Sequence, residues 1–231
     1  MYLKLVRIFG LLTLFFFVLM FIQAGMPKPK PNARFQSVIL DFELVRSKSE
    51  AYSLLGDYRE KEGQETRQIL DKTNLYDFPF IISYSAYTMA ILLFLRSRIS
   101  GGQNIFLQNK IILYLGAVLS LLMCTGDILE NIQLLKITEA VTAEAIFDSS
   151  IKNLIIWTNI KWISIFLSCI LISVFYYFEK SKFRIPLTVL YLACGILGLI
   201  TFIEPSRLAE PVSGLISLCW TGTLVQSFSA R

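Results

Sequence analysis

Long apolar stretches recur along this chain and dominate its pattern of hydrophobic and polar positions. They lie near residues 5–24, 78–95, 111–135, 154–178, 185–203 and 212–226. Runs of about 17 to 25 apolar residues can cross about 30 Å of hydrocarbon as α-helices, which satisfy their own backbone hydrogen bonds. The pattern therefore predicts an all-α fold, a polytopic transmembrane helix bundle of about six spans, of which the last is the shortest.

The composition also indicates a membrane protein. Hydrophobic residues make up 55% of the 231 residues, charged residues make up 17%, and the mean hydropathy is +0.59. Soluble domains usually carry about 45–50% apolar and about 25% charged residues. We therefore expect membrane lipid to be a partner of this chain.

The basic residues are concentrated on particular loops between the spans. They precede the first span or fill the second and fourth loops: Lys4, Arg7, Arg96, Arg98, Lys110, Lys180, Lys182 and Arg184. Short cytoplasmic loops carry the excess of Lys and Arg. We therefore expect both termini to be cytoplasmic. The net charge of +5 is then a topology signal, and no nucleic-acid partner is expected.

The spans divide the chain into four expected parts. Residues 1–26 form an N-terminal transmembrane anchor, 27–76 an outer loop subdomain, 77–178 transmembrane helices two to four, and 179–231 helices five and six. The first part also matches a signal peptide, because its apolar run follows basic residues and ends at Ala24-Gly25. Its continuous length favours the uncleaved anchor.

The outer loop subdomain begins with an extended spacer. Pro27, Pro29 and Pro31 alternate with other residues, a composition that stiffens a chain. The alternation of apolar and polar positions over 38–44 then predicts a short strand or extended edge. Ser47 with Glu50 three positions later is typical of a capping box, which predicts a following amphipathic helix.

Asp77 lies just before the second apolar stretch and has two interpretations. Asp is favoured at a helix N-cap and Pro79 would be tolerated in the first turn, so Asp77 is a plausible cap. However, Asp77, Tyr84 and Thr88 also fall on one helical face. Such a polar stripe inside a span should face protein.

The third and fourth spans contain the residues that are costliest in lipid. Asp127, Glu130 and Asn131 occupy the third, and Lys161 the fourth. A lone charge inside a bilayer helix costs roughly 2.5 to 3.5 kcal/mol on insertion scales, so it normally faces a partner or a wet cavity. A modest loop joins the two spans, which should make them antiparallel neighbours. We therefore expect Asp127 or Glu130 to pair with Lys161.

This group of charges has three possible interpretations. It can be a buried ion pair that fixes helix register. It can also be a proton- or cation-linked pocket, because two carboxylates beside one lysine make one of them hard to ionise. The third interpretation is catalysis. The chain has no histidine, so the usual base and imidazole metal ligands are missing and carboxylates would have to act as acid and base.

The remaining motifs indicate neither a metal site nor a cofactor. The four cysteines lie in different spans without CxxC spacing, and we interpret them as packing residues. The sequence contains no Walker loop, nucleophile elbow or dinucleotide fingerprint. We therefore predict no cofactor and no metal.

Three short motifs resemble a family of small bacterial polytopic integral-membrane proteins that carry no assigned activity. They are Asp-Phe-Pro at 77–79, Asp-x-x-Glu-Asn at 127–131, and Lys161. The resemblance covers spans two to four. It implies a location in the bacterial inner membrane and supplies no reaction, cofactor or substrate.

Together these patterns predict an integral membrane protein with an outward-facing polar pocket that binds a small molecule, an ion or a lipid head group, with proton-linked transport as one use. The ligand-binding candidates are Asp77, Tyr84, Asp127, Glu130, Asn131 and Lys161. The alternatives are a lipid-modifying enzyme that uses carboxylates as acid and base, and a non-catalytic membrane scaffold or assembly protein. The sequence leaves enzymatic activity open.

Overall fold

The computed structural model of the chain describes residues 1–25, 34–99, 110–142, 145–203 and 206–229, and helices are the only regular elements within them. They are α1 (Tyr2–Ala24), α2 (Val38–Glu43), α3 (Lys48–Leu55), α4 (Lys61–Arg98), α6 (Lys110–Thr142), α7 (Asp148–Phe178), α8 (Arg184–Ile203) and α9 (Ala209–Ser229). The predicted all-α fold is confirmed. The prolines of the predicted spacer, Pro27, Pro29 and Pro31, lie outside the described residues.

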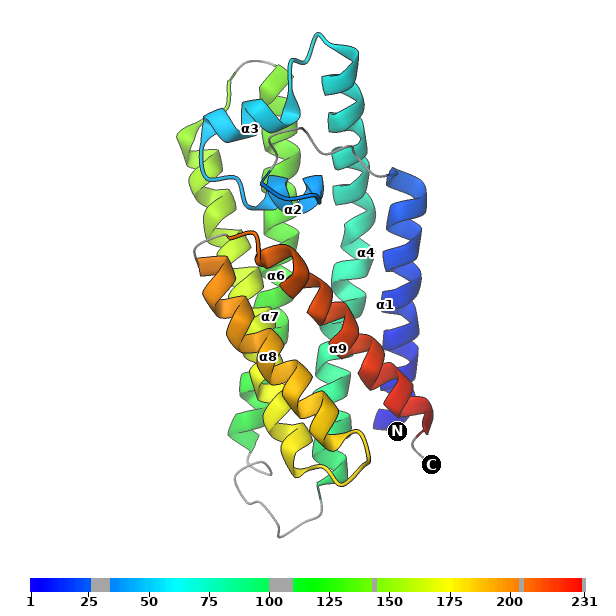
Figure 1. The fold of residues 1–231 in the computed structure, drawn as a ribbon. Coiled ribbons are helices and arrows are strands. Elements are labelled where there is room, and N and C mark those ends of the chain that lie inside the picture. The colour runs from blue at the N-terminus through cyan, green and yellow to red at the C-terminus, as the bar shows by residue number, and fades with distance from the viewer. Residues whose placement is uncertain (26–33, 100–109, 143–144, 204–205, 230–231) are drawn as a thin grey trace.

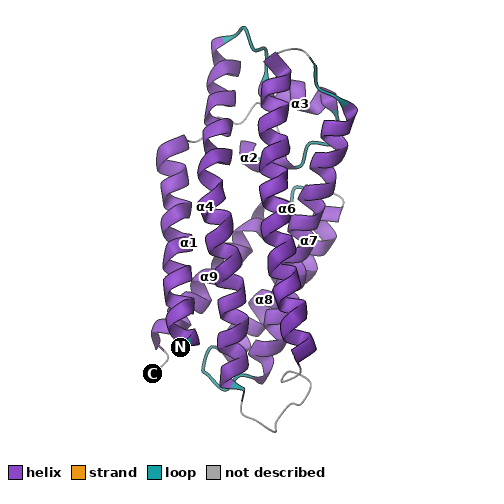
Figure 2. Cartoon of the chain, turned by 180° about the vertical axis from the view of Figure 1, so that it is seen from behind, coloured by secondary structure: helices purple, strands orange, loops and turns teal. Residues whose placement is uncertain are grey.

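The long helices of the described chain form a closed ring in chain order. α1 packs on α4, α4 on α6, α6 on α7, α7 on α8 and α8 on α9, and α9 returns to α1. Seen from behind, α1, α4, α6 and α7 stand side by side (Figure 2). The chain termini lie at one end of the bundle, here called the terminal end, and α2 and α3 lie toward the other, the capped end (Figure 1).

The sides of the bundle are apolar enough to face lipid. Among the described residues, five helices, α1, α4, α6, α7 and α8, are long and apolar enough to cross a membrane. Large hydrophobic side chains are exposed along them, among them Phe15, Leu121 and Ile200. Apolar surface on this scale marks a membrane-contacting protein. α9 has 21 residues and closes the ring, but it is not one of these five helices.

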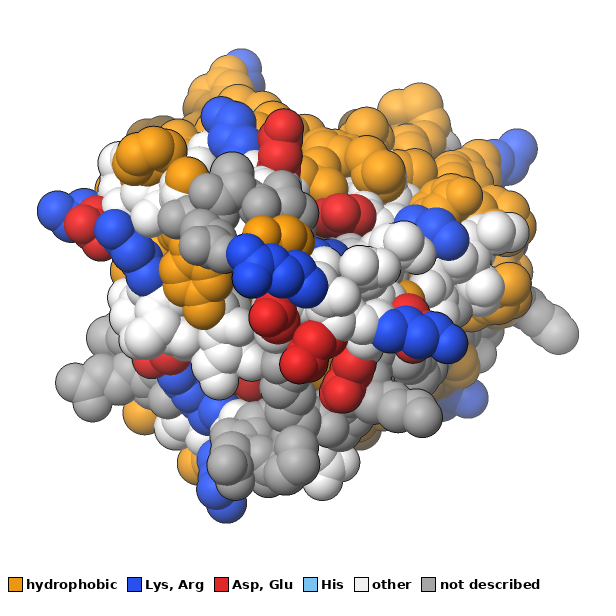
Figure 3. All heavy atoms as spheres, turned by 90° about the horizontal axis from the view of Figure 1, so that it is seen from above, with side chains coloured by type: hydrophobic (Ala, Val, Ile, Leu, Met, Phe, Trp, Pro, Cys, Tyr) orange, Lys and Arg blue, Asp and Glu red, His pale blue; other side chains and the backbone are white. Residues whose placement is uncertain are grey.

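Three helices are longer than a membrane requires. α4, α6 and α7 have 38, 33 and 31 residues, whereas α8 has 20. A helix of about 20 residues already spans about 30 Å. The extra turns reach beyond α1, α8 and α9 at the capped end (Figure 1). Seen from above, charged side chains gather over that end and hydrophobic ones lie toward its rim (Figure 3).

The prediction of a short strand or extended edge over 38–44 is wrong, because residues 38–43 form helix α2. The Ser37 side chain accepts a hydrogen bond from the Leu40 amide at 3.3 Å and so caps the helix. Val38 and Phe42 pack into one apolar cluster, whereas Leu40 and Leu44 pack into the other. Each pair is four residues apart, so a short helix buried on two opposite sides gives the same alternating pattern as a strand.

The start of α3 agrees with the predicted capping box, whereas α4 begins earlier than expected. Ser47 caps α3 as predicted, accepting a hydrogen bond from the Glu50 amide at 3.2 Å. α3 ends at Leu55, because Gly56 adopts a φ of 71°. α4 begins at Lys61, so the interpretation of Asp77 as a helix cap is wrong and the expected boundary at residue 77 falls inside a continuous helix.

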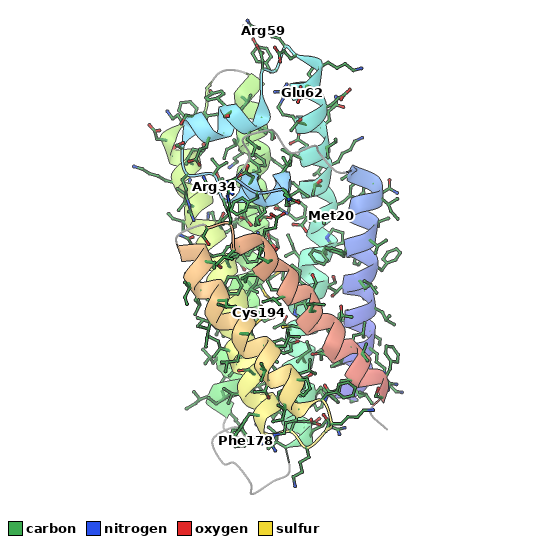
Figure 4. All side chains as sticks on the ribbon, viewed as in Figure 1. Met20, Arg34, Arg59, Glu62, Phe178 and Cys194 are labelled. Atoms are coloured by element: carbon green, nitrogen blue, oxygen red, sulfur yellow. The ribbon has the colours of Figure 1, made fainter. Side chains whose placement is uncertain are left out.

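Small side chains allow close helix packing at several places. A Cβ atom on Gly195 would lie 2.9 Å from the Phe166 carbonyl oxygen, so this glycine lets α8 approach α7 closely. The buried cysteines Cys169, Cys194 and Cys219 come together from α7, α8 and α9, with the Cys194 thiol contacting the other two. Figure 4 shows Cys194 in the middle of the bundle.

Candidate functional site

Lys161 of α7 is buried inside the bundle and contacts three carboxylates. Its Nζ atom lies 2.8 Å from Glu43 Oε2 and 3.3 Å from Asp127 Oδ1, and it also forms an ion pair with Glu130 Oε2. Only 4% of Lys161 is exposed, and Glu130 is fully buried. The expected pairing is thus confirmed, with both acids on one lysine. We call Lys161, Glu43, Asp127 and Glu130 the acidic cluster.

Neutral groups complete the coordination of these carboxylates. The Tyr84 hydroxyl donates a hydrogen bond to Asp127 Oδ2, and Thr158 Oγ1 donates one to Glu130 Oε1 at 2.6 Å. Buried charges are tolerated only when such bonds satisfy their remaining lone pairs. In each of these two acids, one oxygen therefore accepts a hydrogen bond and the other is ion-paired with Lys161.

Asp77 and Asn131 form a separate pair beside the cluster. Asn131 Nδ2 donates a hydrogen bond to Asp77 Oδ2 at 2.8 Å and reaches the Asn74 carbonyl at 3.4 Å. Asp77 thus belongs to the polar stripe of α4 that the sequence predicted with Tyr84. The six residues nominated from the sequence lie together at one level of α4, α6 and α7.

Close packing of α6 on α7 brings the charges together. A Cβ atom on Gly126 would lie 2.8 Å from the Lys161 backbone nitrogen. The glycine therefore lets the helices touch one residue before Asp127. On the other side of α6, Ser120 Oγ donates a 2.7 Å hydrogen bond to the Ser85 carbonyl of α4. Small residues thus seat α6 against both neighbours.

A cavity of about 340 Å³ opens beside the acidic cluster. Its lining includes Asp77, Tyr84, Asp127 and Lys161 of the nominated residues, together with Glu43. Glu130 and Asn131 are not part of the lining. Most other lining side chains are apolar and come from α1, α2, α4, α7 and α9. The cavity thus combines an acidic end with apolar walls, which is the usual composition of a ligand pocket.

An aromatic wall runs along the cavity. Tyr84 stacks on Trp220 with ring centroids 5.2 Å apart, Phe80 lies 5.1 Å from Tyr84, and Phe17 lies 5.7 Å from Phe80. These four rings, here called the aromatic wall, all line the cavity. They join α1, α4 and α9, so the wall depends on the closure of the helix ring.

Asn74 supplies a free donor at the cavity. It is 4% exposed, it lines the cavity, and its Nδ2 atom has no hydrogen-bond partner among the described residues. Asn74 lies three residues before Asp77 on α4 and continues the same face. Asn74 was not among the residues nominated from the sequence, because the second span was expected to begin only after residue 76.

Glu43 is the other contributor that the sequence did not reveal. Burial raises the pKa of the Glu43 carboxyl above its ordinary value of 4.5, while the charge of Lys161 acts in the opposite direction. The residue lies at the end of α2, outside the spans, and no local pattern links it to Lys161. Only the packing of α2 over the bundle brings the two together.

No family model, curated protein or solved structure that we compared with the chain matches it. Among the described residues, no group of three or more His, Cys, Asp or Glu side chains is placed to hold a metal ion.

Proposed function

We propose that this integral membrane protein binds a small molecule or a lipid head group in the cavity beside the acidic cluster. One observation carries the proposal: a cavity of about 340 Å³ is lined by Asp77, Tyr84, Asp127 and Lys161. Ligand pockets commonly measure about 300 to 1,000 Å³ and combine apolar walls with a few convergent polar groups.

The arrangement of the cluster supports a role beyond holding the helices together. A purely structural ion pair needs one acid for one base. Here Lys161 meets Glu43, Asp127 and Glu130, and Asp77 is nearby on the same cavity. Intramembrane acids in excess are costly to bury and usually mark a path for ions, protons or ligands.

The test fills the cavity without changing any charge. Gly214 of α9 lines the cavity, and a Cβ atom there would meet no atom within 4 Å. Gly214→Trp should therefore occupy the space while the fold persists. Leu218→Trp is the matched control, because Leu218 is on the same helix and is 58% exposed.

Native mass spectrometry of the purified protein measures the effect. We expect a co-purifying species in the wild type and in Leu218→Trp, and its loss from Gly214→Trp, with unchanged circular dichroism in all three. A species that remains bound to Gly214→Trp lies elsewhere and would refute the assignment of the cavity.

We also propose that both termini face the cytoplasm, in a bacterial inner membrane. Cytoplasmic loops carry an excess of Lys and Arg. The terminal end carries such residues: Arg7 near the N-terminus, Arg98 at the end of α4 and Arg184 at the start of α8. The bacterial location rests on the family resemblance. A C-terminal fusion to alkaline phosphatase should be inactive and one to green fluorescent protein should fluoresce; the reverse result would invert the topology.

A further inference from the structure

The charged residues of the cavity disfavour anionic ligands. Glu43, Asp77 and Asp127 are the acids in its lining, and Lys161 is the basic residue that the described lining contains. Lys161 is already held by three carboxylates. An anionic ligand would meet three carboxyl groups beside one amine in a poorly solvated site, whereas a second cation would stabilise the ionised form of these carboxyls.

The aromatic wall favours an organic cation over a bare ion. The faces of Trp and Tyr rings attract ammonium groups, and the same rings provide apolar surface for a hydrocarbon chain. Trp220 and Tyr84 are stacked at the cavity, and Tyr84 is tied to Asp127 through its hydroxyl. Acid and aromatic surface therefore meet at one point of the wall.

The free amide of Asn74 adds a requirement for an acceptor. Its Nδ2 atom is buried without a partner among the described residues, and an unsatisfied buried donor is costly. A ligand oxygen at this place would satisfy it. The donor lies one helical turn from Asp77, about 4.5 Å along the helix axis.

The face of α4 orders these chemical groups along the bundle. From the capped end toward the terminal end, the cavity meets Asn74, then Asp77, then Phe80 and Tyr84. A bound molecule would therefore place its acceptor nearest the capped end, its cationic group next, and its apolar part deepest. That is the order of groups in an amphiphile whose head lies at a membrane surface.

The cavity lies between α1 and α9. Phe17 and Met20 of α1 line one side, and Ser213, Gly214 and Ser217 of α9 line the other. α9 crosses the bundle obliquely and approaches α1 toward the terminal end (Figure 1). Met20 lies at the height of α2, in the part of α1 away from that crossing (Figure 4). The site is therefore bordered by the part of α1 that lies away from this crossing.

We propose that the cavity binds a cationic amphiphile, an ammonium group on an apolar chain with a hydrogen-bond acceptor beside the ammonium. The ammonium lies between Asp77 and Asp127, the acceptor takes the hydrogen bond of Asn74, and the chain lies on the aromatic wall. The proposal rests on the proposed function and names its ligand class. An amine-bearing lipid and a free long-chain amine share this chemistry.

The test compares head groups on one apolar chain. The full-length protein, in a neutral maltoside detergent, is titrated with decylammonium, decyl sulfate and decanol at equal mole fractions, and binding is followed by the quenching of tryptophan fluorescence and by the melting temperature. We expect saturable binding of decylammonium only. Asp77→Asn keeps the shape of the side chain and should weaken this binding by at least about tenfold. Glu62→Gln, which removes an exposed acid on the same helix, should not.

The outcomes separate the ligand class from the cavity itself. If decyl sulfate or decanol binds as well as decylammonium and Gly214→Trp abolishes this binding, the cationic class is wrong and the cavity assignment stands. If no probe binds and no co-purifying species depends on Gly214, both fail. Equal binding of decylammonium to wild type and Asp77→Asn also overturns the proposal.

Native mass spectrometry of protein from membranes distinguishes the two sources. A bound mass that matches an amine-bearing glycerolipid, lost in Gly214→Trp, identifies a lipid. A smaller amine, lost in the same variant, identifies a free ligand. Either result supports the proposal, and a bound anionic lipid that depends on Gly214 overturns it.

Discussion

Glu43 of α2 and Lys161 of α7 are 118 positions apart in the sequence, and their charged atoms lie 2.8 Å apart. The pair ties a short helix outside the spans to a lysine deep in the bundle. A second contact reinforces it, because Thr158 Oγ1 donates a hydrogen bond to the Glu43 carbonyl at 3.2 Å. The position of α2 therefore depends on the charge state of the acidic cluster.

Removal of the lysine should be the most damaging change to the cluster. Lys161→Met leaves Glu43, Asp127 and Glu130 without their cation, and breaking a buried ion pair costs about 3 to 5 kcal/mol. Unfolding in mixed micelles measures the loss. Lys152→Met, at an exposed position of the same helix, should change stability by less than about 0.5 kcal/mol.

Adding Glu130→Gln to Lys161→Met tests whether the charges are coupled. The second change removes one uncompensated carboxylate, so the double variant should be more stable than Lys161→Met alone. The glutamine can still accept the hydrogen bond from Thr158. Strictly additive losses would show that the two side chains do not interact.

The contact between α6 and α7 should be sensitive to a single methyl group. Gly126→Ala places a carbon 2.8 Å from the Lys161 backbone nitrogen, so the helices must separate. Overpacking of this kind typically costs about 1 to 3 kcal/mol. Gly214→Ala is the control, since nothing lies within 4 Å of its added carbon. If both variants unfold alike, the close approach at Gly126 does not hold the bundle.

The docking of α2 should weaken as the pH rises. The pKa of Glu43 is raised in the folded protein by burial, so this residue contributes stability below its ordinary value of 4.5, and the contribution is lost as the pH rises through the higher, folded value. Hydrogen-exchange protection of 38–43, corrected for intrinsic rates, should fall as the pH is raised above that ordinary value. Glu43→Gln should remove this dependence; protection that still falls in the variant would assign it to another group.

Arg7 should hold the terminal end of α9. Its guanidinium donates to the Ser227 carbonyl at 2.6 and 3.1 Å, and a cation is favourable at a helix C-terminus. Arg7→Gln should raise hydrogen exchange over the last turn of α9 and cost about 1.5 to 3 kcal/mol. Arg7→Lys, which keeps the charge, should lose less. Unchanged exchange in Arg7→Gln would show that α9 is held by its apolar contacts alone.

The sequence predicted the spans and the central ion pair for the same reason. A bilayer demands long apolar runs, and a charge within such a run must find a partner. Asp127, Glu130 and Lys161 could therefore be paired from depth alone, and the structure brings them together. Gly126, which lets α6 approach α7 beside the site, was not singled out.

The sequence failed where packing between distant segments decides the outcome. The alternation over 38–44 predicted a strand, because two buried sides of a short helix repeat with a similar period over so few residues. The start of α4 was placed too late because its first turns are polar, although they pack on α3 and α6 at the capped end. Asn74 was missed because it lies in these first turns, and Glu43 was missed because only the packing of α2 brings it to Lys161.

The oblique path of α9 has a consequence for how the protein is made. Helices emerge from the ribosome in chain order, and α1, α4, α6 and α7 can associate before α9 exists. Trp220 and Gly214, both on α9, complete the cavity, so the site has no closed wall until α9 has been added. Because α9 is the last of these helices in the chain, completion of the site is a late step in biogenesis.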